Sequence, residues 1–150
     1  IEYAKELKSS ETELYRALTL SNLVTIHQKT GIGRLSAFCG AVSAGAGAGA
    51  GIAYLLGGTF EEIAHTIVNA LAIVSGIVCD GAKASCAAKI ASAVDAGILG
   101  YNMYKQGQQF YDGDGIVIKG VDATIRNVGR LGKDGMKGTN EEIIRIMVGE

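Results

Sequence analysis

Residues 40–56 read GAVSAGAGAGAGIAYLL, and no other segment constrains the architecture as strongly. Glycine alternates with alanine from Ala44 to Gly51, a period of two that by itself would favour a β-strand. That run contains no β-branched or aromatic residue, whereas small residues four apart share one face of a helix. Because glycine costs about 1 kcal/mol relative to alanine inside a helix, neighbours must pack closely against it. The stretch therefore predicts a buried helix.

The segment that follows predicts the second half of a helical hairpin. Gly57 and Gly58 end the first helix, and Thr59 with Glu62 forms a capping box that starts the next. We expect this second helix to run to about Val78. It is apolar almost all round, which indicates a central position. A Gly/Ala-rich helical hairpin is thus predicted at the centre of a compact domain.

The flanking segments are also predicted to be helical. Ser10 and Glu13 form a capping box for a helix that should end near Gly31. Asp80 and Gly81 interrupt the pattern after the hairpin. The further expected elements are a short helical segment at 2–8, a helix from about Lys83 to Gln106, a Gly/Asp-rich loop at 107–120 with a β-like run at 116–118, and helices at about 121–131 and 140–148, the last capped by Thr139 or Asn140. We predict one all-α domain spanning residues 1–150.

Composition excludes several classes of partner. Fourteen Lys and Arg balance fifteen Asp and Glu, so no electrostatic footprint indicates a nucleic acid or an anionic membrane as a partner. No apolar run reaches the roughly 20 residues that a bilayer core requires, so no transmembrane segment is expected. Three cysteines without a secretory signal pattern favour a reducing, cytoplasmic setting. The chain begins at Ile1 within a charged run, which we interpret as a fragment of a longer protein.

The three cysteines are predicted to meet at one end of the hairpin. Cys39 precedes its first helix and Cys79 ends its second. Cys86 would lie about 10.5 Å farther along one continuous helix, but the break at Asp80-Gly81 can fold it back. Thiolates select zinc, copper(I) or iron–sulfur clusters, and three of them leave a coordination position open. The alternative is three small buried hydrophobic residues, and spacing alone leaves both interpretations open.

Several stretches resemble a known family. They are GRLSAFCG at 33–40, the Gly/Ala helix with LLGG at 55–58, SGIVCDGAK at 75–83 followed by Ser85-Cys86, NVGRLG at 127–132 and Gly135-Met136. These stretches resemble the α-chain-like domain of bacterial iron–sulfur L-serine dehydratases, and most of all the branch of L-cysteine desulfidases and related uncharacterised proteins. The resemblance covers roughly residues 10–148. It implies that Cys39, Cys79 and Cys86 ligate a [4Fe-4S] cluster with one iron open for a small amino-acid substrate.

The resemblance implies a lyase that eliminates hydrogen sulfide from L-cysteine, or water from L-serine, to give pyruvate and ammonia. True serine dehydratases carry an acidic residue and a histidine shortly before the second cysteine, where this chain has Ala72 and Ile73. That departure favours the desulfidase branch. The family's N-terminal part, which contributes further active-site residues, is absent, so the chain is expected to be an inactive C-terminal part that needs the rest of the same protein. A homo-oligomer is possible.

Other candidate site residues each have a structural alternative. Arg34 is expected to bind the substrate carboxylate bidentately, or to be a solvated charge. Asp80 and Lys83, between two proposed ligands, are the catalytic candidates, although Asp80 can instead cap the next helix. His65 is expected to be structural and far from the cysteines. The competing function is a non-catalytic structural or regulatory module whose cysteines pack in the core or bind zinc.

Overall fold

The computed structural model describes all of residues 1–150 and contains no β-strand, so the all-α prediction is confirmed. None of its helices combines the length and apolarity that crossing a bilayer requires. The elements are α1 (Glu2–Glu6), α2 (Glu11–Ile32), α3 (Gly40–Leu55), α4 (Phe60–Val74), α5 (Ser85–Lys105), α6 (Val121–Arg130), a π-helical turn η1 (Leu131–Gly135) and α7 (Lys137–Val148).

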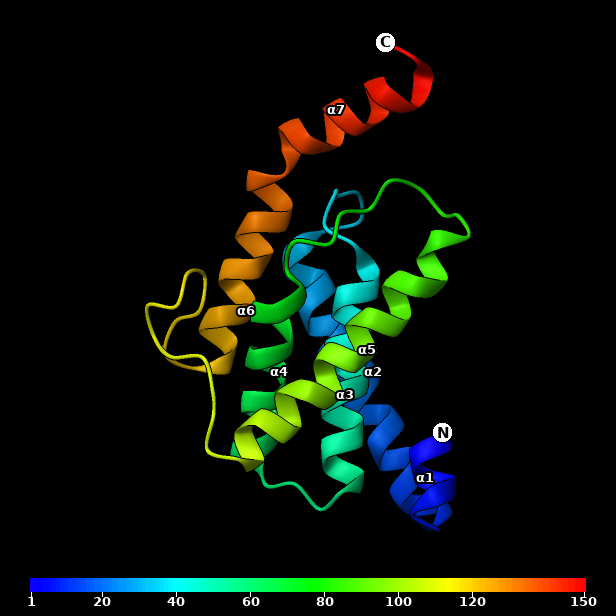
Figure 1. Ribbon diagram of the computed structural model, residues 1–150, viewed down its shortest axis with the longest axis vertical. Coiled ribbons are helices and arrows are strands. Elements are labelled where there is room, and N and C mark those ends of the chain that lie inside the picture. Colours follow the sequence, from blue (N-terminus) through cyan, green and yellow to red (C-terminus); the bar gives the residue numbers. More distant parts are fainter.

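Helix α3 is the central element, surrounded by α2, α4 and α5 (Figure 1). Its alanines Ala46, Ala50 and Ala53 are fully buried. A Cβ placed on Gly45 would lie 2.4 Å from the backbone of Ala93 in α5. Backbones that approach this closely recover the helix propensity lost at glycine, because close contact gains dispersion energy along the whole helix. The prediction of a buried Gly/Ala helix is confirmed.

The helix starts follow the capping signals in the sequence. Ser10 and Thr59 each accept a hydrogen bond from the backbone N–H three residues later, and Glu13 and Glu62 accept in return from the cap residues. These reciprocal bonds satisfy N–H groups that a helix start otherwise leaves free. The hairpin turns at Gly57, whose φ of +77° suits glycine.

Two predicted helix boundaries and the predicted β-like run are wrong. Helix α4 ends at Val74 rather than near Val78, because the chain becomes extended and pairs with the segment before α3. The β-like run at 116–118 forms no strand. The last helix begins at Lys137 without a side-chain cap, since η1 carries α6 almost directly into α7.

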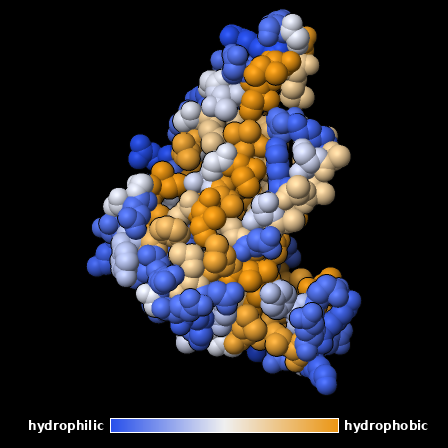
Figure 2. Space-filling view, in the orientation of Figure 1, coloured by the Kyte–Doolittle hydropathy of each residue, from blue (hydrophilic) through white to orange (hydrophobic).

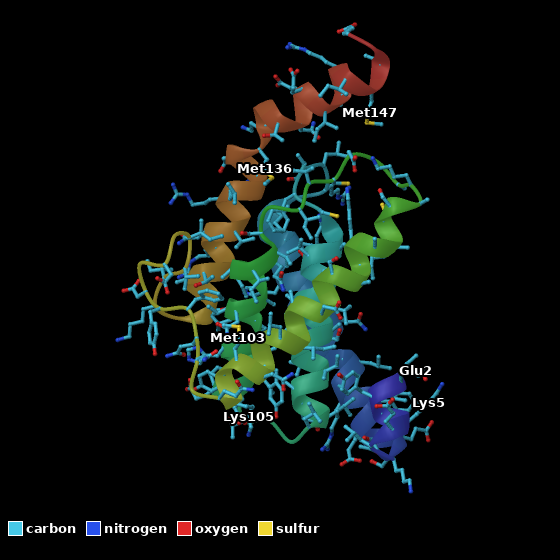
Figure 3. All side chains as sticks on the ribbon, viewed as in Figure 1. Glu2, Lys5, Met103, Lys105, Met136 and Met147 are labelled. Carbon is cyan, nitrogen blue, oxygen red and sulfur yellow. The ribbon has the colours of Figure 1, made fainter.

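Helix α7 projects from the helical body (Figure 1) and has no buried residue. On it Ile144, Ile146, Met147 and Val148 are all more than half exposed. Figure 2 shows an apolar band down the middle of one face that reaches α7. The labelled Met147 lies on the side of α7 toward the 75–84 loop (Figure 3), and its Cε is 3.3 Å from where a Cβ on Gly81 would lie. Helix α7 therefore reaches over the loop at 75–84, which contains Cys79.

Candidate cysteine site

Cys39 and Cys79 are brought together by the only β-bridge in the structure. Phe38 and Val78 pair in antiparallel fashion, the Cys39 N–H donates to the Ile77 carbonyl at 3.1 Å, and the Cys79 N–H donates to the Ala37 carbonyl at 2.6 Å. Successive side chains of extended backbone alternate faces, so both cysteines lie on the face opposite Phe38 and Val78. They are diagonal neighbours, a relation that corresponds to roughly 7–8 Å between residues.

Cys86 reaches the same level through the packing of α5 on α3. Gly45 contacts Ala93 and Gly49 contacts Gly97, so the two helices run parallel in a fixed register. One turn after Cys86, Lys89 lies close enough to both Cys39 and Cys86 for their charges to act on its ammonium group. In the loop between α4 and α5 the chain turns at Gly81, which has a φ of +90°. The Cys86 thiol donates a hydrogen bond to the Gly81 carbonyl at 3.6 Å. The predicted fold-back at this break is present.

Lys89, which the sequence analysis missed, lies among the cysteines. Its Nζ donates to the Val78 carbonyl at 2.8 Å and to Asp80 Oδ1 at 2.6 Å. The hydrogen bond with Asp80 raises the pKa of Lys89, and the charges of Asp80, Cys39 and Cys86 add to the effect. The signal available in the sequence was its i+3 spacing from Cys86, which puts both side chains on one face of α5.

Asp80 binds two ammonium groups. Its carboxylate accepts hydrogen bonds from Lys83 and from Lys89. The bond from Lys83, followed by that from Lys89, lowers the pKa of Asp80 to about 2. Asp80 is therefore ionised at neutral pH and is a weak base. It does not cap α5, whose N-cap residue is Ala84.

Arg34 lies on the loop that leads into Cys39. It is exposed and forms no ion pair, so its guanidinium is free to bind an anion. The loop itself is held by Ser36, whose hydroxyl donates to the Gly132 carbonyl at 2.6 Å and accepts from the Phe38 N–H at 3.0 Å. Arg34 thus stands on an anchored segment beside the first cysteine.

The two histidines lie elsewhere. His65, in α4, stacks on Tyr104 with ring centroids 4.4 Å apart and helps line a pocket of about 740 Å³ that contains no cysteine. His27 pairs with Asp122 at 3.1 Å. Neither histidine is in a position to complete a ligand set with the three cysteines.

The donor set fits a thiolate-bound group in chemistry and location, but it is not a preformed ligand cage. All three cysteines are free thiols at one end of α3. No group of three or more His, Cys, Asp or Glu side chains has an arrangement that could hold a metal ion. Enclosing a cluster would require movement of residues 75–84, which lie outside the helices and carry Cys79 and the Gly81 turn.

Known proteins match this chain along nearly its whole length. The profile of the serine dehydratase alpha chain family matches residues 1–145. A UPF0597 protein of Desulfitobacterium hafniense is 72% identical over 150 residues, covering 100% of this chain and 35% of the relative. A UPF0597 protein of Lachnoclostridium phytofermentans is 57% identical over 148 residues, covering 99% of this chain and 36% of the relative.

A more distant UPF0597 protein, from Phocaeicola vulgatus, is 43% identical over 145 residues, covering 97% of this chain and 34% of the relative. The chain thus spans about a third of the length of the curated relatives it matches. No solved structure matches it. The profile match over residues 1–145, together with the identity to these relatives, shows that the chain belongs to the serine dehydratase alpha chain family.

Proposed function

We propose that this chain is the cluster-binding part of an iron–sulfur lyase that eliminates hydrogen sulfide from L-cysteine, or water from L-serine. The observation that carries the proposal is that the β-bridge puts Cys39 and Cys79 on one face, while the charges of Cys39 and Cys86 both act on Lys89. Iron–sulfur clusters are typical of this family. The matching profile therefore supports a cluster over a merely structural thiol group.

Cys39, Cys79 and Cys86 would hold a [4Fe-4S] cluster, because thiolates are the usual ligands of iron–sulfur clusters. Three protein ligands leave one iron open. When bound, the cluster would supply a Lewis acid that stabilises the departing thiolate or hydroxide.

The chain's own residues would bind the substrate and move protons. Arg34 would hold the substrate carboxylate bidentately. Asp80 would orient Lys83 and Lys89, because its low pKa makes it a poor base but a strong partner for ammonium groups. Lys83, with a side chain 48% exposed, would be the acid or base that substrate reaches. We assign Asp80 and Lys83 to catalysis on this basis.

The reaction balances without a redox partner. The α-carbon loses a proton, the C–S or C–O bond breaks, and its electron pair leaves with sulfur or oxygen. The resulting 2-aminoacrylate tautomerises to an imine, and water hydrolyses the imine to pyruvate and ammonia. Ala72 and Ile73, in place of an acidic residue and a histidine, favour L-cysteine as the substrate.

The active enzyme would also need the part of the protein outside these residues. The relatives are about three times as long, which supports further active-site residues outside the matched region. We propose that this chain is the C-terminal helical part, that the whole protein works in a reducing cytoplasm, and that a homo-oligomer is its assembly.

The test is anaerobic reconstitution of the full-length protein with iron and sulfide. We expect a brown protein with broad visible absorbance, about four irons per chain, and release of pyruvate and sulfide from L-cysteine. A colourless protein that binds no iron would overturn the proposal. A brown protein that turns over L-serine alone would move the substrate assignment to the dehydratase branch.

One observation favours a second function, a non-catalytic structural or regulatory module. Cys39 is only 6% exposed and belongs to the main hydrophobic cluster with Phe38 and Val42, as a packing cysteine would. In that case the protein would bind no metal, or a single colourless zinc ion. Metal analysis of the same reconstituted sample distinguishes the two functions.

A further inference from the structure

Two buried polar side chains have no partner in the fold. Gln28 is 1% exposed, and neither its Nε2 nor its Oε1 forms a hydrogen bond. Ser43 is 0% exposed, and its hydroxyl is also unpaired. Leaving buried polar groups unpaired destabilises a fold, so a fully buried carboxamide without a partner indicates a group that the chain alone does not supply.

The register between α2 and α3 places Gln28 beside Cys39. The helices are antiparallel: the Cβ position of Gly51 lies 3.0 Å from the Ala17 carbonyl, and that of Gly47 lies 2.6 Å from the Ser21 carbonyl. One turn farther on, the Thr25 hydroxyl lies 3.3 Å from the Ser43 carbonyl. Each step of four down α3 is thus a step of four up α2. The next step pairs Cys39 with Lys29, the residue that directly follows Gln28.

Gln28 also lies on the correct face of α2. Ser21 and Thr25 contact α3, and Gln28 follows them by seven and three residues, spacings that keep it on the same side of a helix. Ser43 is four residues after Cys39 in α3. The register therefore puts Gln28 and Ser43 at the first turn of α3, which Cys39 directly precedes.

Lys89 and Cys86 approach this turn from the other side. Helix α5 packs on the face of α3 that carries Gly45 and Gly49, whereas α2 packs on the face that carries Gly47 and Gly51. These two faces are about 200° apart, two residues at 100° each. Cys39 thus lies between the buried amide of Gln28 on the α2 side and the ammonium group of Lys89, whose side chain is 21% exposed, on the α5 side.

We propose that Gln28 is a positioning residue for Cys39. The Nε2–H of Gln28 would donate a hydrogen bond to the Cys39 sulfur when that sulfur is a cluster-bound thiolate. Ser43 would donate to Gln28 Oε1 and fix the carboxamide. The inference rests on the proposed function. A substrate is excluded as the partner because Gln28 is 1% exposed, whereas substrate would bind at the exposed side of the cluster. Hydrogen bonds to cluster sulfurs stabilise the reduced state and the metal ligation.

The test compares full-length Gln28→Met with Gln109→Met after anaerobic reconstitution. Gln109 is the matched control, because it also has a buried unpaired amide oxygen but lines the pocket of His65 rather than the cysteine site. Gln28→Met should lower the reduction potential of the cluster and speed iron loss to a chelator by roughly 10-fold or more. Gln109→Met should change neither. Ser43→Ala should shift both in the same direction by less.

Stability of the metal-free protein separates positioning from packing. Methionine fills a similar volume and removes an unpaired amide, so metal-free Gln28→Met should melt at or above the parent temperature. A much lower melting temperature of metal-free Gln28→Met would overturn the proposed role of Gln28 but not the proposed function. An unchanged reduction potential and an unchanged rate of iron loss in brown Gln28→Met would have the same meaning. A parent protein that takes up no iron would overturn the proposed function together with this inference. If Gln28→Met does not fold, the potential of Ser43→Ala decides.

Discussion

The middle of α3 and its first turn belong to the same helix but have opposite surroundings. In the middle, Gly45, Gly47 and Gly49 let α2 and α5 approach backbone to backbone, and Ala46 and Ala50 are fully buried. At the first turn the neighbours are the β-bridge, the loop that follows it and Lys89. The groups in the middle of α3 find all their contacts within the chain. Near the first turn, by contrast, the cysteines are free thiols and the Gln28 amide is unpaired.

This contrast separates stability from function. A backbone contact with no spare space holds the fold but offers nothing to a ligand. The cysteine end has reactive groups and few helical hydrogen bonds, yet it is mounted on the most tightly packed helix. Functional groups on loops held by a rigid scaffold are a common arrangement in proteins. The comparison predicts that substitutions in the two regions will have separable effects.

The largest expected effect is at Cys79. In the full-length enzyme, Cys79→Ser should lower hydrogen sulfide release by more than about 100-fold, because a serine hydroxyl is a poor ligand for iron. This exceeds the roughly 10–100-fold loss that is typical when a residue contacts a metal ligand but not the metal itself. Iron content and turnover, both measured anaerobically, check this. Metal-free stability should change little. His65→Ala, far from the cysteines, is the control and should keep substantial activity; full turnover in Cys79→Ser would point to the structural module.

In the middle of α3 the effect should fall on stability instead. Gly45→Ala places a Cβ 2.4 Å from the Ala93 backbone, and we expect a loss of at least about 2 kcal/mol in urea denaturation. Gly40→Ala is the matched control in the first turn of the same helix, where a Cβ meets nothing within 4 Å. It should stay within about 0.5 kcal/mol of the parent. Equal melting of both variants would show that α3 is not tightly packed.

Ser36 anchors the loop that precedes Cys39 and should show an intermediate effect. Ser36→Ala removes the bonds to the Gly132 carbonyl and the Phe38 N–H, and we expect a loss of about 1–2 kcal/mol by urea denaturation. Ser92→Ala, exposed on α5, should change stability by less than about 0.5 kcal/mol. If both variants unfold at the same urea concentration as the parent, Ser36 does not anchor the Cys39 loop.

The smallest effect is a pH dependence at the opposite end of α5, where Lys105 lies (Figure 3). The Lys105 hydrogen bond, followed by the bond from the Thr59 backbone, lowers the pKa of Glu62 below its ordinary 4.5. A lowered carboxyl pKa adds stability above pH 4.5, and this stability disappears as the pH falls through the folded value. Glu62→Gln should therefore melt slightly lower at pH 7, and the difference from the parent should shrink as the pH falls below 4.5. A difference that stays constant down to the lowest pH at which the protein is folded would contradict this origin.

The sequence was sufficient for the elements whose signals are local. The capping boxes at Ser10 and Thr59 and the buried Gly/Ala helix were predicted from neighbouring residues and are confirmed. Helix α4 was predicted too long, because its apolar run continues through Val78. Only pairing with residues 37–39, about forty positions earlier, ends the helix, and hydrophobic periodicity cannot report such a partner.

The residues of the candidate site also divide into those that the sequence identified and those that only the structure revealed. Residue type and resemblance identified Cys39, Cys79, Cys86, Arg34, Asp80 and Lys83 as candidates, and the role of each stays a prediction. Lys89 and Gln28 were not identified, because the sequence offered only the i+3 spacing from Cys86 for Lys89 and no signal for Gln28. Their importance comes from the register of α5 and α2 on α3.

By itself, the sequence determined that this chain is helical, that α3 must be buried and that three thiol side chains flank the helical hairpin. These features follow from backbone propensity, capping and side-chain chemistry, which act over a few residues. Only the tertiary structure decided that Asp80 binds two lysines instead of capping α5, and that an unpaired Gln28 faces the first turn of α3. The physical reason is that helix register is set by contacts between distant backbones, here those that glycine permits.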